Sequence, residues 1–391
     1  MKKLFLLLIL VLSATTMFAD DVTLEQALQT ARQFAQHEAA KQPQARRALA
    51  RSNPQLAYSE KSKIAGKDNV YVINFGNDQG FVVVSGETGT SDEILGYCDH
   101  GAFEYDNCPP QLKDLLKFYS RSVDTLRQNP SLAVKRRAAA NYPYYLGTVI
   151  VEPLLTTTWS QGAPYNLHCP NQYYTGCVPT AIAQVMNYWK WPKVTQGKLQ
   201  DVNSGEFTGE DFSGRTYDWD NMLDNYGYDG NQTTYTPYNA VQSEAVARLM
   251  ADIGTAFHTM YGQPNGSPTY FRYEPLIYNF GYSDDIKEHT GKTAAELISV
   301  MKADLEKNRP ILYCGYPKTA GEDGHALVCD GYTSNDYFHF NYGWGGKADG
   351  FFKYALVAGY ENNAIIFTGV EPVDATLKII GNIEYLLIKN G

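Results

Sequence analysis

The spacing of hydrophobic residues divides this 391-residue chain into two units of different pattern. In the first unit, apolar residues recur at helical spacing over 22–37 and 109–126. Between them, 69–87 holds two runs rich in valine, tyrosine and phenylalanine around a Gly-Asn-Asp-Gln-Gly turn, which predicts a β-hairpin. We therefore expect a small α+β domain that ends near Asn129.

Local signals mark the ends of these elements. Thr23 and Gln26 have the spacing of a helix capping box, and a proline opens the second helix. A polar stretch rich in alanine and arginine continues to about Ser59. We expect this stretch to be a linker between the first helix and the hairpin.

The composition changes abruptly between Pro130 and Pro143. Lys135, Arg136 and Arg137 are followed by three alanines, a pattern typical of an exposed and unstructured segment. An ordinary solvated linker would explain this pattern. A processing site between a propeptide and a mature domain would explain it as well, and the second unit has to decide between the two.

The second unit places helices before strands. Apolar residues recur at helical spacing over 177–189, 239–257 and 293–308, and Thr293 and Glu296 form a second capping box. The pattern then changes to that of strands. This order predicts an α+β domain of two lobes, one helical and one an antiparallel sheet. The predicted strands lie within 310–316, 324–332, 336–344, 350–356 and 364–370.

A lone cysteine stands at the start of the helix over 177–189. Gly176 precedes Cys177, and Pro179 is tolerated because the first turn of a helix has no hydrogen bond for its missing N–H to lose. The free N–H groups and positive dipole at a helix start stabilise a thiolate, the nucleophilic form of cysteine. A buried structural cysteine is the commoner role of this residue type, so this stretch alone leaves both interpretations open.

The first twenty residues have the order of a secretory signal peptide. Two lysines precede an apolar run from Leu4 to Leu12, and small residues follow up to Ala19. The run is too short to span a bilayer, and no later segment is long and apolar enough to do so. We expect cleavage after Ala19 and a secreted protein without a membrane anchor. The net charge of −9 argues against nucleic acid as a partner.

Six cysteines are too few and too scattered for a disulfide scaffold. Cys98 and Cys108 could pair across a short loop, and the sequence leaves this open. No close C-x-x-C pair and no H-E-x-x-H motif occurs. The sequence therefore disfavours a metal site.

One histidine has a setting suited to general-base chemistry. His325 follows Gly324 and opens an apolar strand, where a loop meets the predicted sheet. A histidine on a sheet that faces a cysteine on a helix forms the pair that activates a thiol for acyl transfer. The 148 positions between Cys177 and His325 fall within the separation of roughly 130 to 150 that papain-like enzymes show.

Three further residues are candidates to support this pair. Asn341 could accept a ring N–H of His325, and Trp344 could cover the pair from water. The glycines around Trp344 would equally suit a tight aromatic turn between strands. Gln161, sixteen residues before Cys177, could donate its amide to an oxyanion beside the Cys177 N–H.

Four motifs occur in one order along the second unit, namely SQGAPYN, TGCVPTAIAQVMNYWKWP, GHALVCDGY and FHFNYGWGGKADGFF. Together they resemble the streptopain family of secreted bacterial cysteine proteases, which includes interpain-like enzymes. In the first unit, GFVVVSGE followed by EILGY is similar to the inhibitory prodomain of that family. The resemblance covers nearly the whole exported chain. It implies a papain-like two-lobed protease domain preceded by a small α+β prodomain.

The resemblance also implies roles for single residues. Cys177 matches the nucleophile, His325 the general base and Gln161 the oxyanion donor. Trp344 matches the residue beside the histidine. Whether Asn341 or Trp344 orients that histidine stays open.

Two more positions, Gly324 and Ser267, match residues that contact substrate in the family. One position departs from it, because Tyr342 stands where the family often has tryptophan. The substrate cleft of this chain is therefore expected to differ in shape.

The predicted organisation is a signal peptide over 1–19, an inhibitory propeptide domain over 20–137 and a catalytic domain over 138–391. A folded prodomain on the cleft can displace the histidine or occlude the cysteine until it is cut, so the propeptide is expected to be an intramolecular inhibitor. We expect maturation between about Lys135 and Tyr145. Substrates are expected to be proteins and peptides, and the resemblance implies a preference for an apolar residue two before the scissile bond. No cofactor is expected beyond reducing conditions that keep the thiol free.

Two other functions remain to be weighed. A transglutaminase-like acyltransferase uses the same thiol chemistry but resolves the acyl-enzyme with an amine. A non-catalytic inhibitor or binding protein would need only the first unit. The combination of Gln161, Cys177 and His325 argues against a pure binder, which gains nothing from that set.

Overall fold

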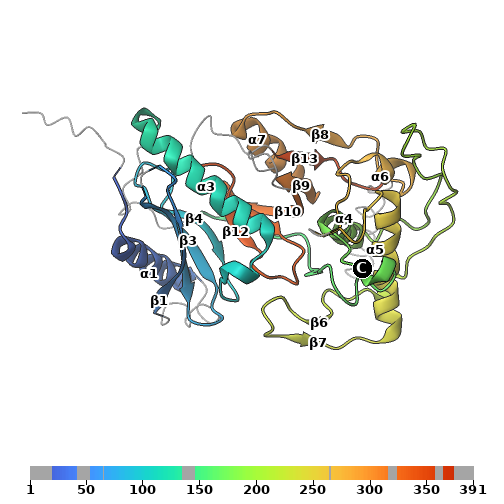
Figure 1. Ribbon diagram of the computed structural model, residues 1–391, viewed down its shortest axis with the longest axis horizontal. Helices are drawn as coiled ribbons and strands as arrows, with labels where there is room; N and C mark the ends of the chain where they lie inside the picture. The colour runs from blue at the N-terminus through green and yellow to red at the C-terminus, as the bar shows by residue number, and fades with distance from the viewer. Residues whose placement is uncertain are drawn as a thin grey trace, which may run out of the picture.

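One antiparallel sheet runs through both units of the chain. The computed structural model describes residues 20–41, 53–64, 66–133, 146–263, 266–315, 324–356 and 364–373. Within these ranges the strand order is β1-β2-β3-β4-β12-β11-β10-β9-β13-β8, and β5 pairs with β10. β1 to β4 belong to the first unit, so the two units share a sheet (Figure 1). The strands are β1 (Pro54–Lys61), β2 (Asp68–Phe75), β3 (Phe81–Ser85), β4 (Ile94–Cys98), β5 (Val149–Val151), β8 (Lys287–His289), β9 (Ile311–Gly315), β10 (His325–Thr333), β11 (Tyr337–Asn341), β12 (Gly350–Lys353) and β13 (Ile365–Thr368), with β6 (Gly227–Tyr228) and β7 (Tyr235–Thr236) as a separate pair.

The two units meet where β4 pairs with β12. Phe351 lies opposite Tyr97, and Phe352 lies opposite Gly96. A Cβ atom on Gly96 would lie 2.1 Å from the Phe352 ring, so only glycine leaves room for that ring. The contact between the units therefore depends on close packing as well as on main-chain pairing.

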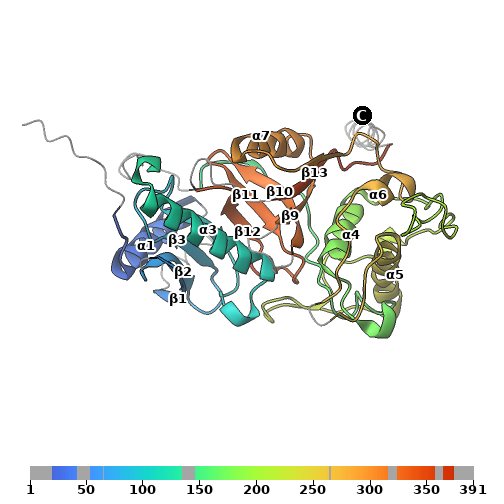
Figure 2. The ribbon, with the colours of Figure 1, turned by 45° about the horizontal axis from the view of Figure 1, so that its top comes forward.

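Two helices sandwich the sheet of the first unit. Helix α1 (Leu24–Lys41) packs on one face, where Phe34 joins a buried cluster with Ile73 and Val84. Helix α3 (Pro110–Gln128) packs on the other face and reaches across into the second unit (Figure 2). Its buried leucines, with Phe118 and Tyr119, belong to one continuous core that contains Phe340 and Phe352 of the second unit. The predicted prodomain and the catalytic unit thus share a hydrophobic core.

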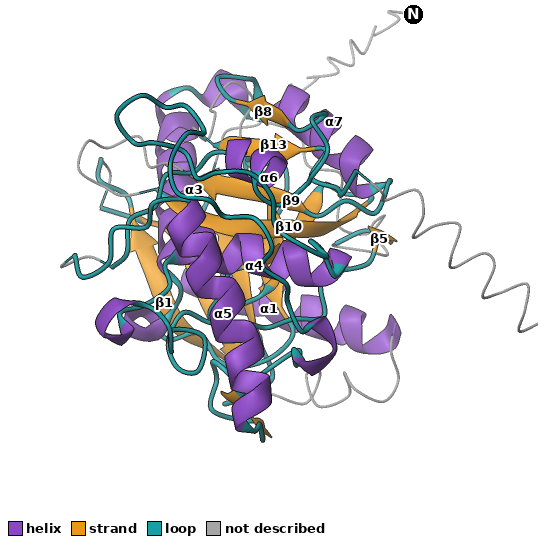
Figure 3. Cartoon of the chain, turned by 90° about the vertical axis from the view of Figure 1, so that its right-hand side faces the viewer, coloured by secondary structure: helices purple, strands orange, loops and turns teal. Residues whose placement is uncertain are grey.

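The helical lobe covers the opposite end of the sheet. Helices α4 (Cys177–Trp189), α5 (Ala240–Ala256) and α6 (Glu274–Tyr278) build its core, and Figure 3 shows α4 and α5 in front of the strands. Strand β10 serves two cores because its side chains alternate between faces. Val328 belongs to the helical-lobe core, whereas Leu327 packs into the core shared with α3 and with α7 (Ala294–Leu305).

The predicted capping boxes are present. Thr23 and Gln26 exchange hydrogen bonds at the start of α1, and Thr293 and Glu296 do so at the start of α7. A third box, which sequence reading missed, joins Asn239 to its partner at the start of α5. The two capping boxes predicted from the sequence are confirmed, since each forms between residues only three positions apart and does not depend on the tertiary fold.

One expectation for the first unit needs correction, and one open question is answered. The stretch up to Ser59 is not wholly a linker, because β1 begins at Pro54 and pairs with β2. Its polar composition reflects an edge strand with mostly exposed side chains. The sequence left open whether Cys98 and Cys108 pair. Both are free thiols in the structure, and the Cys98 thiol donates to the His100 carbonyl at 3.1 Å. The predicted signal peptide and the basic cluster at 135–137 lie outside the described residues.

The β4–β12 junction yields a test with Gly96→Ala. The added methyl group must displace the Phe352 ring, so we expect a loss of about 1–3 kcal/mol of stability, the usual cost of overpacking. Denaturant unfolding of the Cys177→Ala precursor, which prevents self-cleavage, measures the loss. The control is Gly315→Ala in the same sheet, whose added Cβ would make only an ordinary 3.4 Å contact with Tyr313. Equal stability of the two variants would contradict this account of the junction.

Candidate active site

The cysteine that the sequence singled out begins helix α4. Gly176 precedes it with φ of +90°, and a Cβ at Gly176 would lie 2.6 Å from the Ser267 carbonyl oxygen. The Ala326 N–H donates to the Cys177 sulfur at 3.4 Å. The structure describes all six cysteines, and Cys177 alone is not buried. Burial raises the pKa of the Cys108 thiol to about 12, which leaves it protonated at neutral pH.

A cleft of about 630 Å³ brings together six of the seven predicted site residues. Cys177 lies on one wall and His325 on the other, because α4 packs against β10. The other four residues that line the cleft are Gln161, Ser267, Gly324 and Trp344. Cysteine, histidine and the proposed oxyanion donor therefore share one solvent-accessible space.

Hydrogen bonds join the loops beside Cys177 to the segment that precedes it. The Gln161 carbonyl accepts a hydrogen bond of 3.0 Å from the Thr175 N–H. The Ser267 hydroxyl donates to the Tyr174 carbonyl at 2.5 Å. These bonds hold two loops of the cleft against the residues just before Cys177.

Asn341, the seventh predicted residue, lies between the sheet and helix α4. Its side-chain oxygen accepts from Gln184 at 2.9 Å and from the Gly343 N–H at 3.0 Å. Its side-chain nitrogen donates to the Thr157 carbonyl at 2.8 Å. Asn341 is 4 % exposed and does not belong to the residues that line the cleft.

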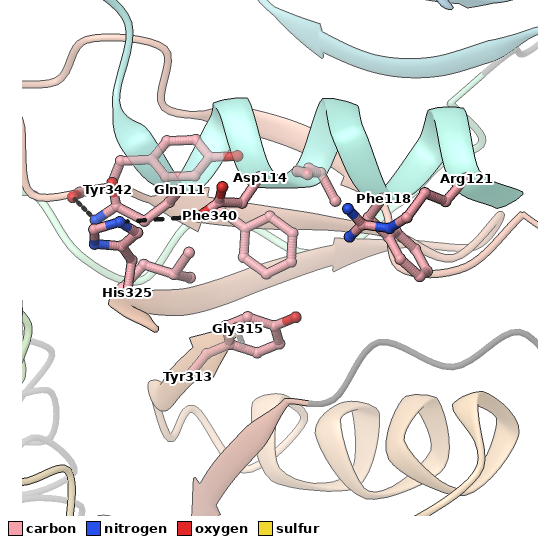
Figure 4. A pocket seen from close by; sticks show the side chains of 11 residues that line it. Gln111, Asp114, Phe118, Arg121, Tyr313, Gly315, His325, Phe340 and Tyr342 are labelled. Carbon is pink, nitrogen blue, oxygen red and sulfur yellow. Dashed lines mark hydrogen bonds and ion pairs between the residues drawn. The ribbon is translucent and has the colours of Figure 1, made fainter. Parts of the chain in front are cut away.

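The described contacts of His325 include the first unit. Its Nε2 lies 3.8 Å from an Asp114 carboxylate oxygen on helix α3 (Figure 4). Gln111, one turn earlier, donates to the Ala326 carbonyl at 3.0 Å and to the Tyr342 carbonyl at 3.3 Å. Helix α3 thus contacts both the histidine and the main chain beside it, over a small cavity of about 40 Å³.

Sequence reading missed Gln111, Asp114 and Gln184 as parts of this site. All three lie in helices that were predicted correctly. Polar residues on such helices are usual, and nothing in their spacing indicates which ones meet the sheet. Gln184 alone could have been found from the sequence, because it is a polar residue within an apolar stretch of helix α4 and such a position is usually buried.

A buried carboxyl group supports the turn that carries Trp344. Asp349 accepts a hydrogen bond of 2.8 Å from the Tyr342 N–H. On the first unit, His100 contacts the Gly346 carbonyl at 2.7 Å. Burial raises the pKa of the Asp349 carboxyl to about 6. The Trp344 turn is therefore held from both units.

The described residues hold neither a metal-binding cluster nor a membrane-spanning helix. Within the described ranges, no group of three or more His, Cys, Asp or Glu side chains is placed to hold a metal ion. No helix among the described residues is long and apolar enough to cross a membrane.

Two family models match the chain, one on each unit. The peptidase C10 family covers residues 159–352, and the Spi protease inhibitor family covers residues 19–123. Every residue that lines the described cleft from α4, β10 and the Trp344 turn falls within the first match. Helix α3 lies largely within the second.

Similar proteins span both units. Streptopain of Streptococcus pyogenes is 30% identical over 313 residues, which are 73% of each chain. The thiol protease/hemagglutinin PrtT of Porphyromonas gingivalis is 28% identical over 405 residues, and the match spans 95% of this chain but only 44% of PrtT. Among solved structures, a prointerpain A fragment of Prevotella intermedia matches with a TM-score of 0.62 and 29% identity, covering 81% of this chain and 99% of that one.

The buried Asp349 carboxyl predicts a pH-dependent stability. Its pKa of about 6 in the folded chain exceeds the unfolded value of about 3.9. Its contribution to stability is therefore complete below about pH 4 and is lost as the pH rises through 6. Relative to Asp349→Asn, the free energy of unfolding of the protein with Asp349 should fall by about 2 kcal/mol between pH 4 and pH 7. Denaturant unfolding of both in the Cys177→Ala precursor measures this, and parallel pH profiles would rule it out.

Proposed function

Because the chain belongs to the peptidase C10 family, we propose that it is a secreted cysteine endopeptidase, made as a zymogen, with Cys177 and His325 as its catalytic pair. The streptopain-family resemblance and the papain-like fold class predicted from the sequence are confirmed by the family match and by the prointerpain A structure. One observation carries the assignment of the pair. The Cys177 sulfur, at the start of a helix, accepts a hydrogen bond from the residue after His325, and both line one cleft.

The proposed chemistry is acyl transfer through the thiol. His325 takes the proton of Cys177, and the resulting thiolate attacks the carbonyl carbon of the scissile peptide bond. The imidazolium then gives its proton to the departing amine. Water, activated by the neutral histidine, attacks the thioester and releases the carboxylic acid product and the thiol.

Gln161 is proposed to stabilise the oxyanion of this reaction. Its side chain lines the same cleft as Cys177, and its carbonyl is fastened to Thr175, two residues before the nucleophile. An amide donor held there, together with the Cys177 N–H at the helix start, would meet the developing negative charge. Trp344, Gly324 and Ser267 are proposed to complete the substrate-binding walls.

The first unit is a Spi-inhibitor-type prodomain, and we propose that helix α3 carries the inhibition. Asp114 forms an ion pair with His325, and Gln111 donates hydrogen bonds to the Ala326 and Tyr342 carbonyls on the sheet that carries His325. We propose that this contact holds the His325 ring toward α3 in the precursor, so that the ring is not placed to take the proton of Cys177. The ion pair is only about a quarter exposed on each side, so it is partly shielded from solvent.

Export and processing complete the proposal. Residues 1–19 are proposed to be a signal peptide, on the pattern of lysines, apolar run and small residues. Maturation is proposed between about Lys135 and Tyr145, and the prodomain and catalytic boundaries are placed at 137 and 138. The basic cluster followed by three alanines is the kind of sequence at which proteolytic cleavage, including cleavage by a second copy of the enzyme, is expected.

The Cys177→Ala variant tests the activity and the self-processing together. Without the thiol, casein hydrolysis in the presence of a reductant should fall to background, and the protein should persist as an uncut precursor. Gel analysis and N-terminal sequencing of the wild-type product should place the new terminus between about 135 and 145. Equal cleavage and activity in both forms would refute the mechanism, and a terminus before Pro130 or beyond Glu152 would refute the processing site.

The Asp114→Asn variant tests the inhibitory contact. Loss of an ion pair of this exposure is worth about 1 kcal/mol, so we expect self-processing of the purified precursor to run about fivefold faster. The matched control is Asp78→Asn, an exposed acid in the β2–β3 turn of the same domain. Densitometry of precursor against time gives both rates. If Asp114→Asn matures no faster than the control, Asp114 does not hold the zymogen.

A further inference from the structure

A buried side-chain amide on helix α4 joins three segments of the active site. Gln184 is fully buried. Its nitrogen donates to the Asn341 side-chain oxygen at 2.9 Å, and its oxygen accepts from the Thr157 hydroxyl and from the Trp159 N–H, each at 3.1 Å. The bonds therefore tie the nucleophile helix to the end of β11 and to the chain segment that leads to Gln161.

The Asn341 side of this contact is equally engaged. Besides Gln184, its oxygen accepts from the Gly343 N–H, and its nitrogen donates to the Thr157 carbonyl. Rotating either amide by 180° would set donors against donors and acceptors against acceptors, so the network permits one orientation. In that orientation the Asn341 oxygen faces Gln184.

Further close packing surrounds the amide pair. The turn after β11 packs closely against α4, because a Cβ atom at Gly343 would lie only 3.0 Å from the Thr180 side chain. The Gly345 N–H donates to the Trp159 carbonyl at 3.2 Å. Thus α4, the 157–161 segment and the 341–346 turn form one junction, defined here as the amide junction.

We propose that Gln184 and Asn341 are positioning residues, which hold Gln161 and Trp344 in place relative to Cys177. The inference rests on the proposed cysteine-protease function. Cys177 lies seven residues before Gln184, Gln161 lies two residues after Trp159, and Trp344 lies three residues after Asn341. Asn341 then acts through Gln184 and not as the direct partner of the histidine ring. A displacement of about 1 Å at such a donor can lower a rate about a hundredfold, because oxyanion stabilisation depends on geometry.

Two rates separate positioning from histidine orientation. Peptide hydrolysis by the matured enzyme depends on the oxyanion donor, whereas alkylation of Cys177 by iodoacetamide reports on the reactive thiolate without an oxyanion. For Gln184→Glu we expect a fall of about tenfold or more in kcat at neutral pH. We expect the alkylation rate and its pH profile to change less than twofold.

Gln184→Glu also supplies a signature that a merely structural residue would not show. The carboxyl keeps an oxygen for Trp159 and Thr157 and loses only the donor to Asn341. When protonated, it donates to Asn341 again. The ratio of variant to wild-type kcat should therefore rise as the pH falls, and a ratio that stays flat would count against the proposal.

Two more variants cover the case in which Gln184→Glu does not fold. Gln184→Met and Asn341→Ala should each lower kcat, and the double variant should be no worse than the more affected single one, because both break the same link. The control is Asn279→Ala, an equally buried amide whose bonds join the 196 and 198 carbonyls away from the cleft. It should leave kcat unchanged.

Three outcomes would overturn the proposal. Asn341→Ala could shift the pH profile of alkylation while the Gln184 variants do not, which would make Asn341 the orienting residue of His325. The junction variants could lower thermal stability with kcat unchanged, or lower kcat no more than Asn279→Ala. The proposed function fails separately, if the wild-type enzyme cleaves peptides no better than Cys177→Ala.

Discussion

The packing of the first turn of helix α4 against the start of strand β10 is the contact on which the active site depends. It sets the Cys177 sulfur 3.4 Å from the Ala326 N–H and so brings the cysteine to the strand that begins with His325. Gly176, just before the helix, has a positive φ and lies close to the Ser267 carbonyl. The start of α4 therefore cannot shift without breaking this contact with the Ser267 loop. The position of Cys177, the proposed nucleophile, is therefore set by the packing between the helical lobe and the sheet.

The same sheet explains how the prodomain is attached. β4 extends the catalytic sheet at β12, and helix α3 contributes to a core that contains Phe340 and Phe352. These contacts bury apolar surface that belongs to both units, which is the dominant stabilising term in folding. Cutting the connecting segment removes one covalent link and none of these contacts, so release of the prodomain is a step distinct from cleavage.

The two halves of the proposed catalytic site are held by contacts with different parts of the molecule. His325 meets Asp114 of the prodomain, whereas Cys177, Gln161 and Trp344 are joined through the buried amides of Gln184 and Asn341. The hydrogen bonds of Gln184 and Asn341 lie within the catalytic unit, whereas α3 contacts His325 and, through Gln111, the main chain at Ala326 and Tyr342. A zymogen of this design can keep the Gln184–Asn341 contact assembled while the inhibitor engages the histidine side of the cleft.

Sequence alone determined the features that rest on short-range spacing. The helix at Cys177, the capping boxes of α1 and α7, the hairpin and the order of the motifs followed from residues a few positions apart. Tertiary structure decided the rest. It converted part of a predicted linker into β1, kept Cys98 and Cys108 as free thiols, joined two predicted domains into one sheet and paired Asp114 with His325. The physical reason is that periodicity along a chain specifies which face of an element is buried, whereas the partner of a polar side chain more than 150 residues away depends on how those faces pack.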